Sequence, residues 1–204
     1  MSNQINIQHS SATNEHYTPV EITQLYAQLI GRQIDLDPFS CEKANQLVNA
    51  RNYYSKENDQ NGFLLPWYGS TFCNPPGGFI DLSTYLPAKR GASSMAAAFD
   101  KAESEYLAGN VEQILFVAFS LELLTKRPSI ANYPRCFVNT TGHDNYPHLV
   151  TGGGRLKYLD ANLELQKSPT HGSFLIYFPP KGSERLYSLA FSELFSSFGS
   201  VVLP

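Results

Sequence analysis

The sequence predicts an α/β fold built on a mostly parallel, twisted sheet with helices on both faces. Short apolar runs typical of strands alternate along the chain with segments whose apolar residues recur at helical spacing. Two of these runs, 114–119 and 174–178, are apolar throughout, as strands covered on both faces are. The chain has 204 residues, 42% of them hydrophobic, which suffices for one domain with a large buried core.

The N-terminal sixteen residues are polar and predict a flexible arm (1–16), followed by a single domain over 17–204. A helix is expected to begin at Thr18-Pro19-Val20-Glu21, which has the pattern of a capping box with proline at the first helical position. Apolar residues at helical spacing continue to Leu29, and Gly31 is typical of a helix end.

Two short strands that end in proline turns follow this helix. Residues 34–38 predict a strand that ends at Pro38, and Ser40 is expected to cap a second helix. Residues 71–73 predict another strand, which the sequence Asn-Pro-Pro-Gly-Gly at 74–78 interrupts at once. The remaining predicted elements are a helix from Ser93 or Ser94 to Gly109, strands at 114–119 and 174–178, weaker strands at 136–138 and 156–159, and a last helix between Ser183 and Gly199.

Basic side chains concentrate in one stretch of a chain whose net charge is −3. Residues 126–157 carry five lysines and arginines and a single acid, whereas the parts on either side are acidic. This stretch either binds an anionic partner or is a solvated loop. No apolar run could span a membrane and no secretory signal is present, so we expect a cytoplasmic protein without membrane contact. Three scattered cysteines indicate neither a disulfide framework nor a zinc site, and no metal is expected.

Polar residues follow two of the predicted strands. The segments 35–38 and 74–77 both lie at predicted strand ends, and ligands of parallel sheets bind beyond the carboxyl ends of the strands. In Asn74-Pro75-Pro76, the asparagine and the prolines offer carbonyl oxygens held in a stiff backbone. Such acceptors suit an amino group with two hydrogens to donate, although Asn-Pro-Pro-Gly is also an ordinary turn sequence.

Several blocks of the sequence, in order, resemble the phage-type DNA adenine-N6 methyltransferases, which use S-adenosylmethionine. The likeness covers about residues 14–178 and is densest between 14 and 80. The blocks are His16-Tyr17-Thr18-Pro19, 34–40, Asn45, Ala50, Tyr53-Tyr54, Asn61-Gly62-Phe63, Trp67, 72–76, 154–158, and Ser168-Pro169 before 173–178. The resemblance implies a Rossmann-like methyltransferase sheet, with the methyl donor lying over the strand ends.

The resemblance also implies roles for individual residues. Tyr17, Thr18 and Pro19 would contact the methionine end of S-adenosylmethionine. Asp35 or Asp37 would bind its amino group or ribose, and Asn61 would lie near its adenine ring. For Thr18 a simple capping role, and for the two aspartates a turn role, are the alternatives. The catalytic residues would be Asn74, Pro75 and Pro76.

The sequence departs from the family where the substrate base would lie. Gly77 and Gly78 follow Asn-Pro-Pro, where the family has an aromatic residue that stacks on the extruded base. Either Phe79 substitutes for it or the glycines leave room for a larger substrate. The glycine-rich loop common after such strands is also missing after Asp37. Arg155 and Lys157 would neutralise DNA phosphates, and 125–172 is a possible DNA-contacting insertion.

The function implied is methylation of an exocyclic amino group in DNA, at adenine N6. Cytosine N4 or a protein amide presents a similar planar amino group and remains open. So does an inactive methyltransferase fold that binds DNA or acts as a decoy. The resemblance points to a phage or mobile element as the source, and the oligomeric state stays undetermined.

Overall fold

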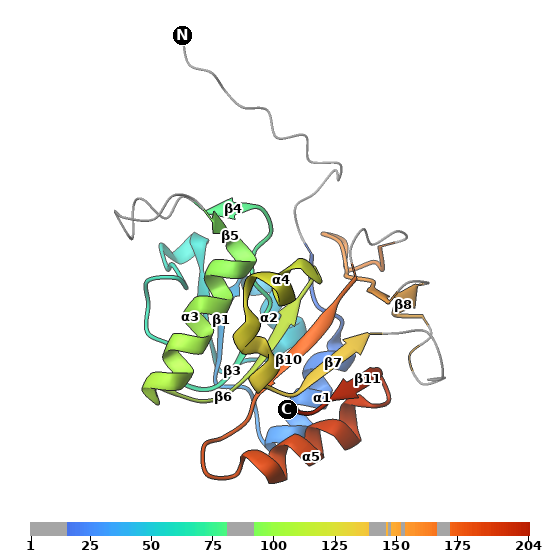
Figure 1. Cartoon of the computed structure of the whole chain (residues 1–204). Coiled ribbons are helices and arrows are strands. Elements are labelled where there is room, and N and C mark those ends of the chain that lie inside the picture. The colour runs from blue at the N-terminus through green and yellow to red at the C-terminus, as the bar shows by residue number, and fades with distance from the viewer. Residues whose placement is uncertain (1–15, 81–91, 139–145, 147, 152–153, 167–171) are drawn as a thin grey trace.

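A seven-stranded sheet forms the centre of the computed structural model, which describes residues 16–80, 92–138, 146, 148–151, 154–166 and 172–204 (Figure 1). The strand order is β11-β7-β10-β6-β3-β1-β2. These strands are β1 (Leu36–Ser40), β2 (Asn52–Ser55), β3 (Gly69–Cys73), β6 (Val111–Ala118), β7 (Arg135–Val138), β10 (Phe174–Phe178) and β11 (Gly199–Val202). Two small antiparallel pairs lie outside this sheet: β4 (Phe79–Ile80) with β5 (Ala92–Ser93), and β8 (Val150–Thr151) with β9 (Arg155–Leu156). The predicted arm, apart from His16, and the Ser168-Pro169 block lie outside the described residues.

Helices cover both faces of the sheet, as the sequence predicts. The helices are α1 (Val20–Ile30), α2 (Glu42–Val48), α3 (Ser94–Ala108), α4 (Glu122–Lys126) and α5 (Glu184–Phe195), with 3-10 turns at Lys56–Asn58 and Pro128–Asn132. Side chains of α1 and α5 pack with Leu115 and Tyr177 in one core. Side chains of α3 and α4 pack with Phe116 and Phe178 in a second core on the opposite face. Strands β6 and β10 are therefore buried on both sides over the apolar runs 114–118 and 174–178, which explains why these runs are unbroken.

The sheet is mixed, and the expectation of a mostly parallel sheet holds for only one half of it. Strands β2, β1, β3 and β6 pair in parallel. Strand β10 runs antiparallel to both β6 and β7, and β11 runs antiparallel to β7. The reason is the connection between β7 and β10. The chain returns into the sheet from the edge at which β7 ended, and a parallel strand would have needed a crossover to the other edge.

Two of the predicted helix caps are wrong in detail. Helix α1 has Pro19 as its N-cap, and no side chain caps it, so Thr18 forms no capping box. Strand β1 continues as far as Ser40, so the cap of α2 is Cys41, whose Sγ accepts a hydrogen bond from the Ala44 N–H. The caps at Ser93 and at the left-handed Gly31 and Gly109 are confirmed.

The neighbouring strands β1 and β3 form a topological switch point. From β1 the chain crosses through α2 on one face of the sheet to the outer strand β2. From β3 it crosses through α3 on the other face to β6. The two connections diverge from the carboxyl ends of adjacent strands, which in α/β sheets is where ligands bind. We call the edge at which β1, β3 and β6 end the carboxyl edge.

Candidate functional site at the carboxyl edge

Asp37 is a buried carboxylate within β1. Its side chain is 2% exposed, and no lysine or arginine of the described residues pairs with it. Its hydrogen-bond partners are the Phe39 N–H, 3.2 Å from Oδ1, and the Ser40 hydroxyl. Burial raises the pKa of Asp37 to about 7, and these two hydrogen bonds only partly oppose the rise. The side chain is thus suited to a ligand that brings a cation or hydroxyl groups.

Asn74 follows β3 at the carboxyl edge, and its amide has a defined orientation. Its amide nitrogen lies 3.0 Å from the backbone carbonyl oxygen of His16. A carbonyl oxygen can only accept a hydrogen bond, so the atom facing it must be the NH₂ group. The amide oxygen Oδ1 has no partner among the described residues and remains an available acceptor. The adjoining Pro75 is buried and Pro76 is half-buried.

The segment His16–Thr18, here called the strap, crosses from Asn74 to a distant part of the chain. The Tyr17 N–H and carbonyl each form a 2.9 Å hydrogen bond with the backbone of Leu159, as in a short antiparallel ladder. The phenol of Tyr17 lies 3.8 Å from the Cys41 sulfur, beside the start of α2. The strap therefore joins the ends of β1 and β3 to the segment that follows β9.

Thr18 has an unsatisfied hydroxyl at this place. The residue is 3% exposed, and Oγ1 has no hydrogen-bond partner in the part of the chain that the structure describes. Leaving such a group unpaired costs about 1–3 kcal/mol. Pro19, which follows, is the N-cap of α1. The cost would be offset by a ligand that hydrogen-bonds to the threonine.

Asn61 lies in a turn that packs against the end of β1. Its Oδ1 accepts a hydrogen bond from the Phe63 N–H at 3.0 Å. A Cβ on the neighbouring Gly62 would lie 2.0 Å from the Pro38 carbonyl oxygen, so only glycine allows this approach. The Trp67 indole donates to the Gly62 carbonyl at 2.8 Å, and the Phe39 and Phe63 rings lie 4.6 Å apart. Asn61 is thereby held beside β1.

Asp35 is not brought together with these residues. It precedes β1 and lies at the opposite edge of the sheet, where it forms ion pairs with Arg32 and Arg51. Its Oδ2 also accepts a hydrogen bond from the Ser70 N–H at 2.8 Å, which ties β1 to the start of β3. Of the two aspartates that the sequence offers, Asp37 is the one whose charge affects the pKa of Cys73, the residue before Asn74.

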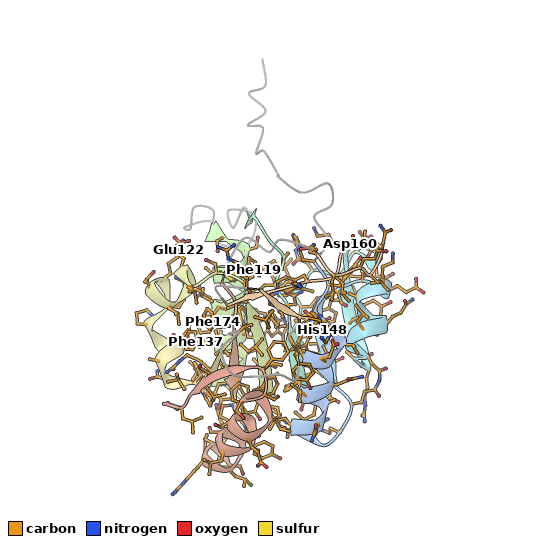
Figure 2. All side chains as sticks on the ribbon, turned by 90° about the vertical axis from the view of Figure 1, so that its right-hand side faces the viewer. Phe119, Glu122, Phe137, His148, Asp160 and Phe174 are labelled. Atoms are coloured by element: carbon orange, nitrogen blue, oxygen red, sulfur yellow. The ribbon has the colours of Figure 1, made fainter. Side chains whose placement is uncertain are left out.

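The two glycines after Asn-Pro-Pro are open to solvent. A Cβ on Gly77 would meet nothing within 4 Å, and its φ is not positive. Gly78 has φ +83°, and its carbonyl accepts a hydrogen bond from the Ser94 N–H. The backbone of Phe79 begins β4, and its side chain lies outside what the structure describes. Phe119, at the end of β6 beside β3, is a half-buried aromatic residue that the sequence does not single out (Figure 2).

The basic stretch is not one continuous surface. Lys126 and Arg127 pair with acids of α4 and α3, and Arg135 donates to backbone carbonyls of its own turn. Arg155 and Lys157 lie in and directly after β9, close to the bridge between Tyr17 and Leu159. The range 125–172 also contains β7, a strand of the central sheet, so that part of the range is core.

Several further chemical features bear on the site. Burial raises the pKa of Cys73, next to Asn74, far above its usual value, so this cysteine is a protonated core residue.

Among the residues that the structure describes, no three His, Cys, Asp or Glu side chains gather as metal ligands would. No helix in the described ranges is long and apolar enough to cross a bilayer. His16 and Gln166, which join the strap to the segment after β9, are not among the predicted site residues.

No protein-family model, no curated protein and no solved structure matches this chain.

Proposed function

We propose that this protein methylates an exocyclic amino group in DNA, at adenine N6, with S-adenosylmethionine as methyl donor. One observation carries the proposal: at the switch point of the sheet, Asn74 presents an amide oxygen without a partner among the described residues, on the strand next to the buried Asp37. An acceptor that faces the substrate calls for a donor on the substrate, and an amino group is such a donor. The nearby carboxylate suits the positively charged methyl donor.

The topology supports a Rossmann-like methyltransferase fold. Four parallel strands carry helical crossovers on both faces. Asn74 directly follows β3, and Asp37 lies within the adjacent strand β1. A dinucleotide-binding oxidoreductase would share this arrangement, but the phosphate-binding sequence GxGxxG does not follow β1. The missing phosphate-binding sequence therefore argues against a ligand with a pyrophosphate group.

The residues at the carboxyl edge fit S-adenosylmethionine. The Asp37 carboxylate would bind its ammonium group or ribose hydroxyls, and the orphaned Thr18 hydroxyl would gain the partner that it lacks. Tyr17 and Pro19 flank Thr18, and Asn61 would lie near the adenine ring. When bound, the donor supplies a methyl carbon that bonds to the amine nitrogen, while the electron pair of the broken carbon–sulfur bond stays on sulfur and one amine proton is released.

The task of the protein is then to orient a weak nucleophile. The lone pair of an exocyclic amine is delocalised into the base, which makes the nitrogen unreactive. Hydrogen bonds from the two amine hydrogens to Asn74 Oδ1 and to the Pro75 carbonyl would favour the geometry in which that lone pair can attack. The prolines keep these acceptors in place, so little reorganisation is needed during the reaction. The base would have to leave a duplex to reach them.

The base itself has room at Gly77. An aromatic ring is absent there, and the space beside Gly77 is open, so the substrate must gain its stacking from another side chain or do without it. Arg155 and Lys157 would contact the phosphates that flank the extruded nucleotide and would supply affinity without sequence preference.

The test is nucleoside mass spectrometry on DNA from a host without methyltransferases that expresses the protein. We expect N6-methyladenine with the wild type and none with Asn74→Ala. N4-methylcytosine in its place would retain the mechanism and overturn the choice of base. If the folded, abundant protein leaves no modified base while binding DNA, the inactive DNA-binding alternative replaces the proposal.

A control must separate chemistry from donor binding. Titration calorimetry with S-adenosylmethionine should give similar affinities for the wild type and for Asn74→Ala, and a much weaker one for Asp37→Ala. If Asp37→Ala binds as well as the wild type, the donor site has been assigned wrongly.

A further inference from the structure

The orientation of the Asn74 amide depends on the position of one backbone carbonyl. The amide nitrogen donates to His16 O at 3.0 Å, and this contact turns Oδ1 away from the strap. If the carbonyl moved, the amide could rotate by 180° and present its NH₂ group instead. An NH₂ group cannot accept a hydrogen bond from a substrate amine, so the rotated form would be unproductive.

Contacts from a distant segment hold His16 in place. The side-chain amide of Gln166 lies with its nitrogen 2.8 Å and its oxygen 3.2 Å from His16 Nδ1. The imidazole also packs edge-on against the Tyr158 ring, with 6.1 Å between ring centroids. The backbone N–H of Gln166 donates a hydrogen bond to the backbone carbonyl of Tyr158 at 2.9 Å. The two side chains that contact His16 therefore belong to backbone segments that are hydrogen-bonded to each other. The Tyr17–Leu159 ladder completes the attachment.

We propose that Gln166 is a positioning residue: through His16 and the strap, it keeps Asn74 with its oxygen toward the substrate. The inference rests on the proposed function, because it names what orients the acceptor of that reaction. In this role Gln166 acts on Asn74 through its contact with His16. The Gln166 side chain can form this contact whether or not His16 Nδ1 carries a proton, because its amide can donate a hydrogen bond to Nδ1 or accept one from Nδ1–H.

The same segment carries the basic side chains that would contact DNA. Arg155 and Lys157 precede Tyr158 and Leu159 in one continuous piece of chain, and Leu159 also bridges to Leu165 next to Gln166. Docking of a phosphate backbone on this piece would therefore stiffen the unit that holds His16. The fold thus links engagement of the nucleic acid with the catalytic orientation of Asn74.

The test compares Gln166→Met, which keeps the length of the side chain and removes its amide, with Gln166→Glu. The carboxylate can still accept a hydrogen bond from Nδ1–H, so Gln166→Glu should retain the contact. The matched control is Gln33→Met, since Gln33 is an exposed glutamine whose amide donates to the Asn49 carbonyl near the amino end of β1. We expect kcat to fall about ten- to a hundredfold in Gln166→Met, with the affinities for donor and DNA unchanged. Gln166→Glu should recover most of the rate, and Gln33→Met should match the wild type.

A structural readout keeps this proposal separate from the proposed function. The side-chain NH₂ resonances of Asn74 can be assigned in a ¹H–¹⁵N spectrum as the pair that is missing from Asn74→Ala. In Gln166→Met these resonances should move and their hydrogens should exchange faster with solvent, whether or not the protein methylates anything. Unchanged resonances, or a kcat within twofold of the wild type, would overturn the positioning role. A wild type that methylates no substrate would overturn the proposed function instead.

Discussion

At the scale of single residues, Asp37 is a buried carboxyl group whose titration should affect the stability of the fold. Its carboxyl has a pKa of about 7 in the folded protein, against 3.8 in an unfolded chain, because burial disfavours the charged form. At pH 8 the folded protein therefore carries a penalty of about 4 kcal/mol, from 1.36 kcal/mol for each pKa unit. The penalty shrinks as the pH falls through 7 and disappears below the unfolded pKa.

The expected result is that Asp37→Asn stabilises the protein at alkaline pH more than at acidic pH. The free energy of unfolding, measured with urea, should favour the variant by about 2–3 kcal/mol more at pH 8 than at pH 5, since only the wild type gains stability by protonation over that range. Asp59→Asn, which alters an exposed carboxylate, is the matched control and should show no such trend. If the difference in free energy of unfolding between Asp37→Asn and the wild type is the same at pH 5 and pH 8, Asp37 is either neutral over that whole range or hydrated in the folded protein.

Gly77 stands where the proposed class of methyltransferase has an aromatic residue, and it can be changed without strain. A Cβ there meets nothing within 4 Å, so Gly77→Phe should cost almost no stability. If the substrate is a flipped base, the added ring should tighten binding of the extruded nucleotide by about 1–3 kcal/mol. Fluorescence anisotropy with an oligonucleotide that carries an abasic site opposite the target, compared with an intact duplex, measures this gain. Leu186→Phe, which places a ring at an exposed helical position near the start of α5, should leave affinity unchanged, and equal effects at the two positions would argue against base stacking.

At the scale of elements, the turn that follows β2 is fixed to β1 by one glycine. Gly62→Ala would put a methyl group 2.0 Å from the Pro38 carbonyl oxygen and 2.8 Å from the Phe39 ring, so the turn must move away. Overpacking of this kind costs about 1–3 kcal/mol. We expect the melting temperature to fall and donor affinity to fall with it, because Asn61 moves with the turn. Gly77→Ala, an equal change in open space, should leave the melting temperature unaltered. A stable Gly62→Ala protein would show that the turn is not packed as described.

Elements that depend on local sequence could be predicted, and those that depend on distant pairing could not. The predicted runs 114–119 and 174–178 correspond to β6, which spans Val111–Ala118, and to β10, because both faces of the sheet are covered there. Helices α1 and α3 follow from their apolar spacing and glycine ends. The antiparallel direction of β10 depends instead on where the chain re-enters the sheet, which no local pattern records.

The candidate site divides in the same way. The sequence singles out Asn74 and the two aspartates, but only the fold separates Asp37, at the switch point, from Asp35, which is paired with arginines at the opposite edge. In the sequence, Thr18 has the position of a helix cap, and only the structure shows that its buried hydroxyl has no hydrogen-bond partner among the described residues. Gln166 reaches His16 across 150 residues of chain, so no spacing rule could have found it.

At the scale of the whole molecule, the proposed function would require an acidic protein to attract DNA, an acidic polymer, through a small part of its surface. The net charge is −3, and three of the five cations of the basic stretch form ion pairs or hydrogen bonds far from the strap. Arg155 and Lys157 are the basic side chains of that stretch nearest the strap. Under the proposed function, this arrangement would confine DNA contact to the carboxyl edge, where the extruded base would enter.

The last prediction concerns the salt dependence of DNA binding at this edge. On duplex DNA, each phosphate that the protein neutralises adds about 0.9 to the steepness with which log K falls against log salt. Arg155→Ala combined with Lys157→Ala should therefore reduce the slope by about 2 and weaken binding to all sequences alike, with donor affinity unchanged. Arg185→Ala, which removes an exposed cation at the start of α5 near the amino edge, is the control. If Arg185→Ala reduces the slope of log K against log salt by as much per removed cation as the double variant does, DNA affinity depends only on the net charge of the protein. A slope that changes in neither variant would move the DNA-binding surface away from the segment after β9.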